Sequence, residues 1–419
     1  MGAAPEAAAL PPHTVVVTGL GTTNPLGGDT AATWAALREG RCAVRALDEP
    51  WTEEHDLPVR LAAPLAVDPS GLLTPKERRR LDRASQVALL AAREAWARAG
   101  SPEVDGERLA VSVSPGMGPV LSVMEAWDAL REKGPRRVLP TAVPALMPNA
   151  PAATVGIELG AVGGIHAPVS ACASGTEAIA YGADLIALDR ADVVVAGGTD
   201  AALHPMTVAA FGAMRALSTR NDDPSTASRP FAPDRDGFVL GEGAGVLVLE
   251  SDAHAAARGA EVLAVLAGAA VTADAYDVAR PEPTGAQQER ALRLALERAG
   301  VSPEELGHVN AHATSTPAGD VVEARVLART VPGAAVSATK SATGHLLGGA
   351  GGLEAVLTVM ALVEGRLPPT LLPGGIDPEI AETGLDVVGP EGREAPGLRA
   401  AASTSFGFGG HDAALVLTR

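Results

Sequence analysis

The cysteine at position 172 lies in a segment that favours thiol chemistry. The sequence around it, APVSACASGTEAIAYGADLIALDR, is a short apolar strand-like run followed by a long helical stretch. This order predicts a thiol at the start of a helix, where backbone N–H groups and the helix dipole lower a thiol pKa. The small residues beside it leave room for a bulky substrate. A buried structural cysteine is the alternative, and this segment alone does not decide between the two.

Two histidines and a lysine follow later in the chain, each near a predicted strand end or helix start. The segment GHVNAHATSTPAGDVVEA places His312 at the end of a strand, and SATKSATGHLLGGAGGLEA places Lys340 before His345 at the opening of a helix. A single histidine is more often a satisfied core or surface residue than a catalytic one. Two of them, with a lysine and a candidate nucleophile, are harder to explain by packing alone. The glycine pairs in the second segment predict that its helix packs closely on a neighbour.

The last informative segment, STSFGFGGHDAALVL, places Phe408 between Gly407 and Gly409. Alternating glycine and aromatic residues are typical of a mobile loop, or of a place where backbone N–H groups approach a ligand. A β-bulge before the last strand is the structural alternative, and both can hold together. The early segment VVVTGLGTTNPLGG does not complete a dinucleotide fingerprint, because Asn24 occupies the third glycine position, so we expect a strand and a tight turn there.

The elements that position these residues alternate between strands and helices. Short β-branched runs near 13–19, 108–114, 191–198, 245–251, 307–313, 334–340 and the C-terminus predict strands, and alanine- and leucine-rich stretches at 85–100, 175–190 and 285–300 predict helices. This alternation predicts a layered α/β architecture with largely buried sheets. The pattern restarts after a weak seam near 250–262, which indicates a pseudo-duplication. We expect a flexible leader at 1–12, a first half at 13–253 and a second half at 254–419.

The bulk composition excludes several classes of protein. The chain has 419 residues, a formal net charge of −17 and two cysteines, Cys42 and Cys172. The negative charge argues against a general nucleic-acid binder, because such affinity comes from neutralising phosphates. Two cysteines without a C-x-x-C pair predict neither a disulfide framework nor a metal site. We expect no signal peptide and no membrane span, and therefore a soluble cytoplasmic protein.

Together these segments resemble the β-ketoacyl-[acyl carrier protein] synthases of the thiolase superfamily, in the elongating branch similar to ketoacyl synthase II. The likeness runs from VVVTGLGTTNPLG through MRALSTRNDDPSTASRPFAPDRDGFVLGEGAG to SFGFGG, and so covers nearly the whole chain. It implies a thiolase fold in which two pseudo-duplicated halves form five layers, αβαβα. Thiolases carry a second catalytic cysteine in the C-terminal half, starter-type synthases use Cys-His-Asn, and chain-length factors lack the cysteine. The order Cys172, His312, His345 is that of an active elongating synthase.

The resemblance also implies a role for each site residue. Cys172 would attack an acyl thioester, and the backbone N–H groups of Cys172 and Phe408 would hold the tetrahedral oxyanion, a single donor being worth about 3 kcal/mol. His312 and His345, neutral and donating from Nε2, would stabilise the enolate left when malonyl carrier protein loses CO2. Gly407 and Gly409 would let Phe408 act as a gate. Supporting or substrate-binding roles are implied for Lys340, Glu354, Asp320, Thr314 and Thr316.

The implied reaction is decarboxylative condensation of an acyl-enzyme with malonyl-[acyl carrier protein], giving the 3-oxoacyl carrier in fatty acid chain elongation. It needs no metal and no resident cofactor, because phosphopantetheine arrives on the carrier. The alternatives are a type II polyketide ketosynthase working with a chain-length partner and a non-catalytic dimerisation subunit. We expect a homodimer, or a heterodimer with a homologous subunit. Two departures, Ala313 for a common Gly and Asp277 for a frequent His, leave the acyl-chain preference open.

A basic segment, TPKERRRLDR, stands out in this acidic chain. We expect it to begin a helix, where basic side chains oppose the helix dipole and so need a reason other than helix stability. A solvated helix face is the simpler interpretation. The segment matches the carrier-docking patch of the family at Lys76, Arg79 and Arg80, and an acidic carrier protein would be steered by such a patch.

Overall fold

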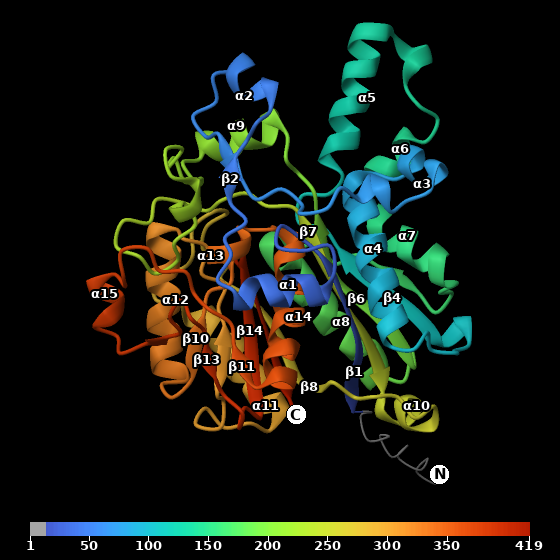
Figure 1. Ribbon diagram of the computed structural model, residues 1–419. Helices are drawn as coiled ribbons and strands as arrows, with labels where there is room; N and C mark the ends of the chain where they lie inside the picture. Colours follow the sequence, from blue (N-terminus) through green and yellow to red (C-terminus); the bar gives the residue numbers. More distant parts are fainter. Residues whose placement is uncertain (1–13) are drawn as a thin grey trace, which may run out of the picture.

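Buried, valine- and alanine-rich strands form the centre of the molecule in the computed structural model, which describes residues 14–419 (Figure 1). The predicted leader at 1–12 lies outside the described residues. Eleven strands make one mixed sheet. In spatial order they are β12 (Asp386–Val387), β10 (Ala335–Ser337), β9 (His308–Asn310), β14 (Ala400–Gly407), β15 (His411–Thr418), β8 (Ala264–Ala273), β1 (Val15–Thr23), β7 (Gly243–Ser251), β6 (Val193–Asp200), β4 (Leu109–Ser114) and β5 (Ile165–His166).

The strand order repeats on the two sides of the sheet. The order β1-β7-β6-β4-β5 on one side is matched by β8-β15-β14-β9-β10 on the other, and each corresponding pair of neighbours runs in the same relative direction. The two sides meet where β1 pairs antiparallel with β8. The sheet therefore confirms the predicted pseudo-duplication. The predicted boundary between 253 and 254, which falls within the short helix that precedes β8, stays a prediction.

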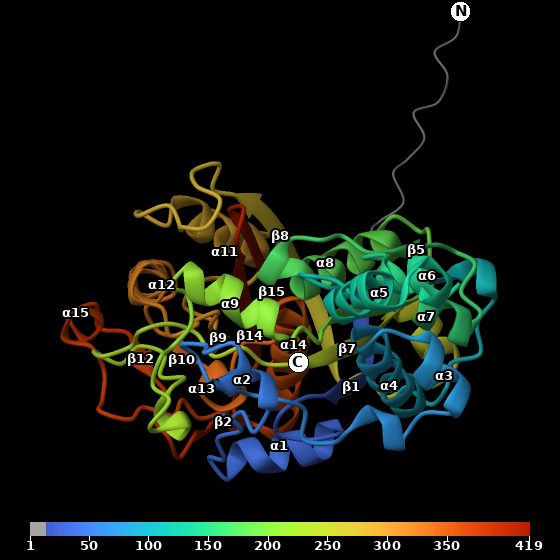
Figure 2. The ribbon, with the colours of Figure 1, turned by 90° about the horizontal axis from the view of Figure 1, so that it is seen from above.

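Two central helices lie between the two halves of this sheet, which are the two sides described above. Other helices cover the outer face of each half. The helices α8 (Ser174–Ala187) and α14 (Gly348–Glu364) pack against strands of both sides, while α4 (Arg83–Arg98) and α7 (Ala150–Leu159) cover the first side and α11 (Ala286–Ala299) and α12 (Pro317–Thr330) the second. Figures 1 and 2 show the outer pairs at opposite ends of the molecule. These are the five layers expected from the resemblance.

Shorter elements complete the fold around this frame. Two small sheets pair β2 (Arg45–Ala46) with β3 (Leu61–Ala62) and β11 (Arg366–Leu367) with β13 (Arg393–Glu394). The remaining α-helices are α1 (Thr30–Arg38), α2 (Pro50–Glu54), α3 (Pro75–Arg80), α5 (Val120–Lys133), α6 (Ala142–Leu146), α9 (Pro205–Ala213), α10 (Asp252–Ala257), α13 (Lys340–Thr343) and α15 (Pro378–Ala381). Within residues 14–419, no helix combines the length and apolar character that crossing a membrane requires.

The glycines of α14 let the two central helices and the sheet approach closely, as predicted. A Cβ on Gly352 would lie 2.2 Å from the carbonyl oxygen of Gly245 on β7, a distance that no real side chain makes. Fifteen residues of α14, from Gly348 to Leu362, are buried. This helix therefore fixes whatever precedes it, including the loop that carries His345, against the first side of the sheet.

Candidate active site

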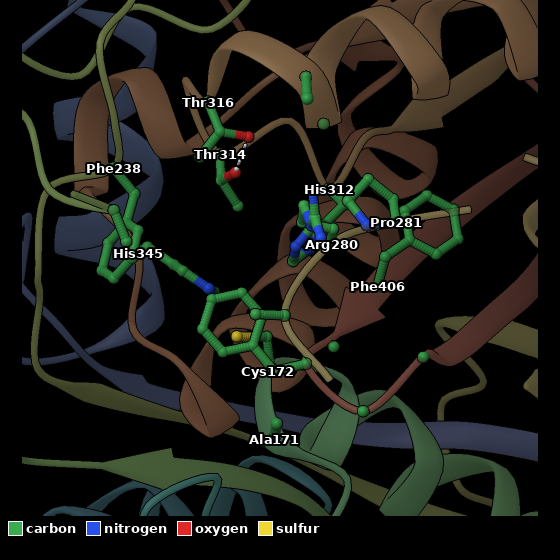
Figure 3. A pocket seen from close by; sticks show the side chains of 18 of the residues that line it. Ala171, Cys172, Phe238, Arg280, Pro281, His312, Thr314, Thr316, His345 and Phe406 are labelled. Atoms are coloured by element: carbon green, nitrogen blue, oxygen red, sulfur yellow. Dashed lines mark hydrogen bonds between the residues drawn. The ribbon is translucent and has the colours of Figure 1, made fainter. Parts of the chain in front are cut away.

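A cavity of about 410 Å³ opens where the two sides of the sheet meet the N-terminal ends of the central helices. It brings together Cys172 from the first half of the chain with His312 and His345 from the second. In Figure 3 the thiol of Cys172 lies between His345 and Phe406, and Thr314 and Thr316 lie on the opposite wall. The predicted catalytic trio therefore shares one cavity, although its members are separated by up to 173 positions in the sequence, from 172 to 345.

Cys172 lies in a tight 3₁₀ turn, Ala171–Ala173, that leads directly into α8. Ala171 takes a φ of +50°, a left-handed conformation that reverses the chain just before the thiol. The turn of β14 and β15 packs against this loop, because a Cβ on Gly407 would lie 2.5 Å from the carbonyl oxygen of Ser170. Backbone N–H groups of Phe408 and Cys172 reach the sulfur. These are the two N–H groups that the resemblance implies as oxyanion donors.

The pKa of the Cys172 thiol differs from the sequence-based expectation. Burial raises it to about 12, and the charge of Lys340 and the two backbone N–H groups offset that increase only in part. The expected lowering by the helix dipole is therefore wrong as a net effect, because the effect of lost hydration on the thiol pKa is larger. The resting thiol is neutral at physiological pH.

The two histidine rings are in edge-to-face contact with each other in the cavity wall. Their centroids are 5.4 Å apart with nearly perpendicular planes, and His345 makes a second edge contact with Phe238 at 5.3 Å. Burial and the charge of Lys340 hold both pKa values well below the usual 6.5, so both rings are neutral. Among the described residues, neither ring nitrogen of His345 nor the Nδ1 of His312 has a hydrogen-bond partner. Two neutral rings therefore keep hydrogen-bonding capacity for a ligand.

Lys340 lies behind the cavity wall. Its side chain is 1% exposed, and its ammonium group forms an ion pair with Glu354 on α14, whose side chain is 2% exposed. Burial raises the pKa of Glu354 to about 7, and the ion pair opposes this increase. The predicted link between Lys340 and Glu354 is thus present as a contact. The cation lies near enough to lower the histidine pKa values without lining the cavity.

Comparison with known proteins places this chain in a family. Residues 13–255 match "Beta-ketoacyl synthase, N-terminal domain" and residues 263–372 match "Beta-ketoacyl synthase, C-terminal domain". The chain belongs to the β-ketoacyl synthase family. It is 44% identical over 409 residues to 3-oxoacyl-[acyl-carrier-protein] synthase 2 of Mycobacterium tuberculosis, with 97% of each chain covered. It is 41% identical over 412 residues to the protein of that name from Staphylococcus aureus, with 97% and 98% covered.

Solved structures confirm the thiolase-like fold of this β-ketoacyl synthase. A β-ketoacyl synthase from Burkholderia phymatum has a TM-score of 0.89 at 36% identity, covering 97% of this chain and 99% of that one. A type II polyketide ketosynthase, solved with its acyl-carrier protein and bound to a hexaketide, also has a TM-score of 0.89, at 28% identity and with the same coverage. The resemblance stated from sequence motifs is confirmed at the level of family and fold.

A buried carboxylate that sequence analysis did not single out fixes the His312 loop of this synthase. Glu323 on α12 accepts hydrogen bonds from the backbone N–H of His312 at 2.8 Å and of Ala313 at 2.6 Å, and from the Thr404 hydroxyl at 2.9 Å. Ala313 takes a φ of +20°, at the edge of the region that favours glycine. The carboxylate holds this strained turn, and the acidic side chain eleven positions after His312 is the only sequence signal for it.

A second missed carboxylate, Asp200 at the end of β6, ties three segments together beneath the thiol. It accepts hydrogen bonds from the backbone N–H groups of Gly116 at 2.8 Å and Gly348 at 2.7 Å, and it contacts that of Met117 at 3.3 Å. Burial raises its pKa to about 7. Asp200 thus joins the start of α14 to the loop before α5. Its partners come from two segments, one at Gly116 and Met117 and the other at Gly348, so no local pattern could have found it.

The remaining predicted residues lie at the cavity wall or at its entrance. The hydroxyls of Thr314 and Thr316 are 3.2 Å apart, and Asp320 accepts backbone N–H groups of Phe231 at 2.9 Å and Thr316 at 3.2 Å. Asp277, the departure noted in the sequence, also lines the cavity. All four residues line the cavity, and their chemical roles stay predictions.

The basic segment differs in detail from its predicted form. Lys76, Arg79 and Arg80 are exposed on the short helix α3, but Arg78, Arg79 and Arg80 occupy its last turn. Basic residues at a helix C-terminus are favoured by the dipole, so the expected conflict with helix stability is wrong. Arg83 begins the next helix, α4, and is paired with Glu242 at 2.5 Å. Arg83 therefore belongs to an ion pair with a buried carboxylate, and the exposed basic patch consists of the residues of α3.

Proposed function

We propose that this β-ketoacyl synthase catalyses the condensation of an acyl group, held on Cys172, with malonyl-[acyl carrier protein] to give the 3-oxoacyl carrier, CO2 and free carrier. The observation that carries this proposal is the single cavity in which Cys172, two neutral histidines and two backbone N–H groups converge. The names of the relatives, 3-oxoacyl-[acyl-carrier-protein] synthase 2, support it.

Acylation moves the acyl group from the carrier thiol to Cys172. Because the resting thiol is neutral, its proton must leave as the sulfur attacks the thioester carbonyl. The tetrahedral oxygen is stabilised by the N–H groups of Cys172 and Phe408. When the intermediate collapses, the C–S bond to the carrier breaks and the departing thiolate takes up one proton. A neutral His345, whose ring nitrogens have no partner among the described residues, can relay that proton.

Condensation follows when malonyl carrier protein occupies the cavity. The C–C bond to the malonyl carboxylate breaks, CO2 leaves, and the electron pair forms an enolate whose oxygen accepts hydrogen bonds from His312 and His345. Neutral rings suit this role, since imidazolium would protonate the carbanion. The carbanion attacks acyl-Cys172, and the thiolate released takes up a proton. Lys340, held by Glu354, keeps both rings neutral through its charge.

The direct test is incubation of the purified protein with acyl- and malonyl-carrier proteins, with mass spectrometry of protein and product. We expect one acyl group on Cys172 and a product carrier two carbons longer as its 3-oxo thioester. Acyl transfer without CO2 release would contradict condensation. The residues of the chain require no metal or resident cofactor in either step, and repeating the assay after chelation tests this.

A second candidate is a type II polyketide ketosynthase, because two solved neighbours come from such systems, one of them the ishigamide ketosynthase/chain length factor at 31% identity and a TM-score of 0.86. The mass of the product distinguishes the pathways. Release after one condensation and acceptance of the reduced product indicate fatty acid elongation, whereas repeated condensation without reduction, in the presence of a homologous cysteine-less subunit, indicates polyketide synthesis.

We also propose that a second ketosynthase chain packs on the edge strand β5. Ile157 and Val162 beside this edge are 80% and 71% exposed, and Ile165 on the strand is 39% exposed. An unpaired edge with apolar neighbours favours pairing with another strand. Light scattering on the purified chain is expected to give the mass of a dimer, and a monomer would favour a heterologous partner. The cytoplasmic location stays a prediction.

A further inference from the structure

Two carboxyl groups, neither used in the mechanism above, meet at the rim of the Cys172 cavity. Asp412 is the second residue of β15 and is 1% exposed, and Asp274 directly follows β8, the strand paired with it. Both line the cavity, and the side chains are within hydrogen-bonding reach of each other. Two carboxylates at that distance repel each other, so the arrangement is favourable only when they share one proton.

The pair lies where two segments of the cavity wall are joined. The backbone N–H of Asp274 donates to the carbonyl of Gly410 at 2.8 Å, and that of Gly409 donates to the carbonyl of Val278 at 2.9 Å. These bonds connect the loop at 274–284 to the turn that carries Phe408. A Cβ on Gly410 would lie 2.8 Å from the Cβ of Asp274, so the contact is close. A change in repulsion at the pair acts directly on this junction.

No cation compensates the pair within the described residues. The loop contributes Asp277, Arg280 and Glu282, but Arg280 is 79% exposed and pairs with Asp277 at 3.4 Å, while Glu282 reaches Asp274 only through its backbone N–H at 3.0 Å. His411 precedes Asp412 on β15, and the neutral side chain of Gln288 faces the cavity from α11. One oxygen of each carboxyl has no hydrogen-bond donor, which is the arrangement expected where a proton holds the pair together.

We propose that Asp274 and Asp412 form a proton-held latch between the 274–284 loop and the Gly407–Gly410 turn. The latch is closed while the pair shares a proton, and it loosens when both carboxyls are ionised. Asp412 and Asp274 are thus positioning residues for the wall that carries the Phe408 N–H. Its consequence for acyl exchange rests on the proposed function, whereas the latch itself does not.

The direction of the pH dependence follows from the buried member. Burial, followed by the charge of Asp274, raises the pKa of Asp412 from 3.8 to about 8. The native protein therefore retains a proton that the unfolded chain loses at lower pH. The stabilisation that the latch provides is complete at pH values below about 4 and falls as pH rises towards about 8. The turn is expected to be held at neutral pH and loosened above it.

Hydrogen exchange of the intact protein without substrate tests the latch, with wild type compared with Asp412→Asn at each pH so that the intrinsic exchange rate cancels. Asparagine keeps the size of the side chain and donates permanently. At pH 6.5 we expect equal exchange in peptides covering 274–284 and 405–412. At pH 9.5 wild type is expected to exchange several-fold faster than the variant in these peptides only, with core strands β6 and β7 unchanged.

Asp274→Asn serves as the second variant if the first does not fold, and the same flattening of the pH response is expected. A ratio of wild-type to variant exchange that stays constant from pH 6.5 to 9.5 would overturn the latch. Since no step of this measurement uses acyl or malonyl carriers, failure of the condensation assay and failure of the latch are separate results.

Discussion

The ionisable groups in and behind the Cys172 cavity have their protonation states set mainly by burial. Burial raises the pKa of Cys172 to about 12 and that of Glu354 to about 7, and it lowers the pKa values of both histidines. A resting cavity without a thiolate and without imidazolium avoids unproductive reactions. Charge then develops only when a thioester carbonyl enters the reach of the backbone N–H groups.

The first prediction concerns the nucleophile. Cys172→Ala is expected to abolish acyl-enzyme formation and condensation while leaving the fold intact, because alanine occupies the neighbouring positions of the same turn. Intact mass and peptide mapping after incubation with an acyl carrier measure the adduct. Cys42→Ala is the matched control and should behave as wild type, since Cys42 lies outside the cavity. Acylation at Cys42 would refute the assignment.

The second prediction concerns the histidine pair. Replacing His312 or His345 with Ala is expected to leave part of the acyl transfer to Cys172, since backbone N–H groups hold that oxyanion. Decarboxylation of malonyl carrier protein should fall on the order of 100-fold or more, as for loss of an oxyanion donor. CO2 release and acyl-enzyme mass are measured on the same variants. Release of CO2 at the wild-type rate by either variant would rule out the role.

How much of the site is visible in sequence depends on whether its signal is local. Cys172, His312 and His345 stand in distinctive short segments and could be found one by one. Asp200 could not, because its partners Gly116 and Gly348 are brought together only by the fold. The sign of the Cys172 pKa shift was also inaccessible, since a helix start is a local feature whereas burial depends on segments that only the fold brings together.

At the scale of elements, the central helices position the Cys172 and His345 loops, whereas the β14–β15 turn positions Phe408. The helices α8 and α14 are buried between the two sides of the sheet and hold the Cys172 and His345 loops rigidly. Phe408 follows β14 in the turn before β15, and Gly409 takes a φ of +90°. A rigid nucleophile beside a turn built on glycines allows one wall to move without disturbing the other.

The third prediction concerns this turn. Phe408→Ala is expected to alter the relative rates with short and long acyl donors, because a half-buried ring between two glycines can swing without straining its neighbours. Acylation rates with a series of donor chain lengths measure the effect. Gly409→Ala is a useful companion, since a Cβ at φ +90° is strained and should slow all donors alike. Unchanged rates and an unchanged chain-length profile in Phe408→Ala would contradict a gate.

Sequence patterns predicted the elements unevenly. Valine-rich strands such as β6 and β7 and long helices such as α4 lie where their patterns indicated. The strands β8 and β14 were missed, because AVLAGAAVTA and AAASTSFG are rich in alanine and glycine, which do not mark strands. These small residues are needed there, since β8 packs closely on α11. The small residues that close packing requires are therefore the reason why the sequence pattern did not indicate these two strands.

The whole molecule presents an electrostatic problem to its proposed partner. The chain carries a net charge of −17, and acyl carrier proteins are acidic as well. Attraction must therefore be local. Lys76, Arg79 and Arg80 are exposed on α3, and none of them makes an ion pair with another described residue. Arg79 and Arg80 line a hollow of about 160 Å³ together with two further basic residues, Arg78 and Arg137, and one acidic residue, Glu125. This combination of concavity and unpaired positive charge suits an anionic helix or phosphate.

The fourth prediction tests this surface. Arg79→Glu combined with Arg80→Glu is expected to raise the KM for carrier-bound substrates several-fold or more, because steering and docking charges are reversed. The double variant should react with a small thiol reagent at Cys172 as wild type does, since the chemistry lies elsewhere. Steady-state kinetics at low ionic strength measure KM, and wild-type affinity should itself weaken as salt is added.

A matched control separates local docking from overall charge. Arg38→Glu combined with Arg290→Glu makes the same change in net charge on α1 and α11, away from the basic hollow. If only local charge matters, this control keeps a wild-type KM while the α3 variant does not. Equal KM values in the α3 variant and the wild type at low salt would move the docking site elsewhere. Equal increases of KM in both double variants would instead mean that long-range repulsion between two acidic proteins governs the encounter. Such repulsion acts over long distances at low ionic strength, because the Debye length is then comparable to the size of a domain.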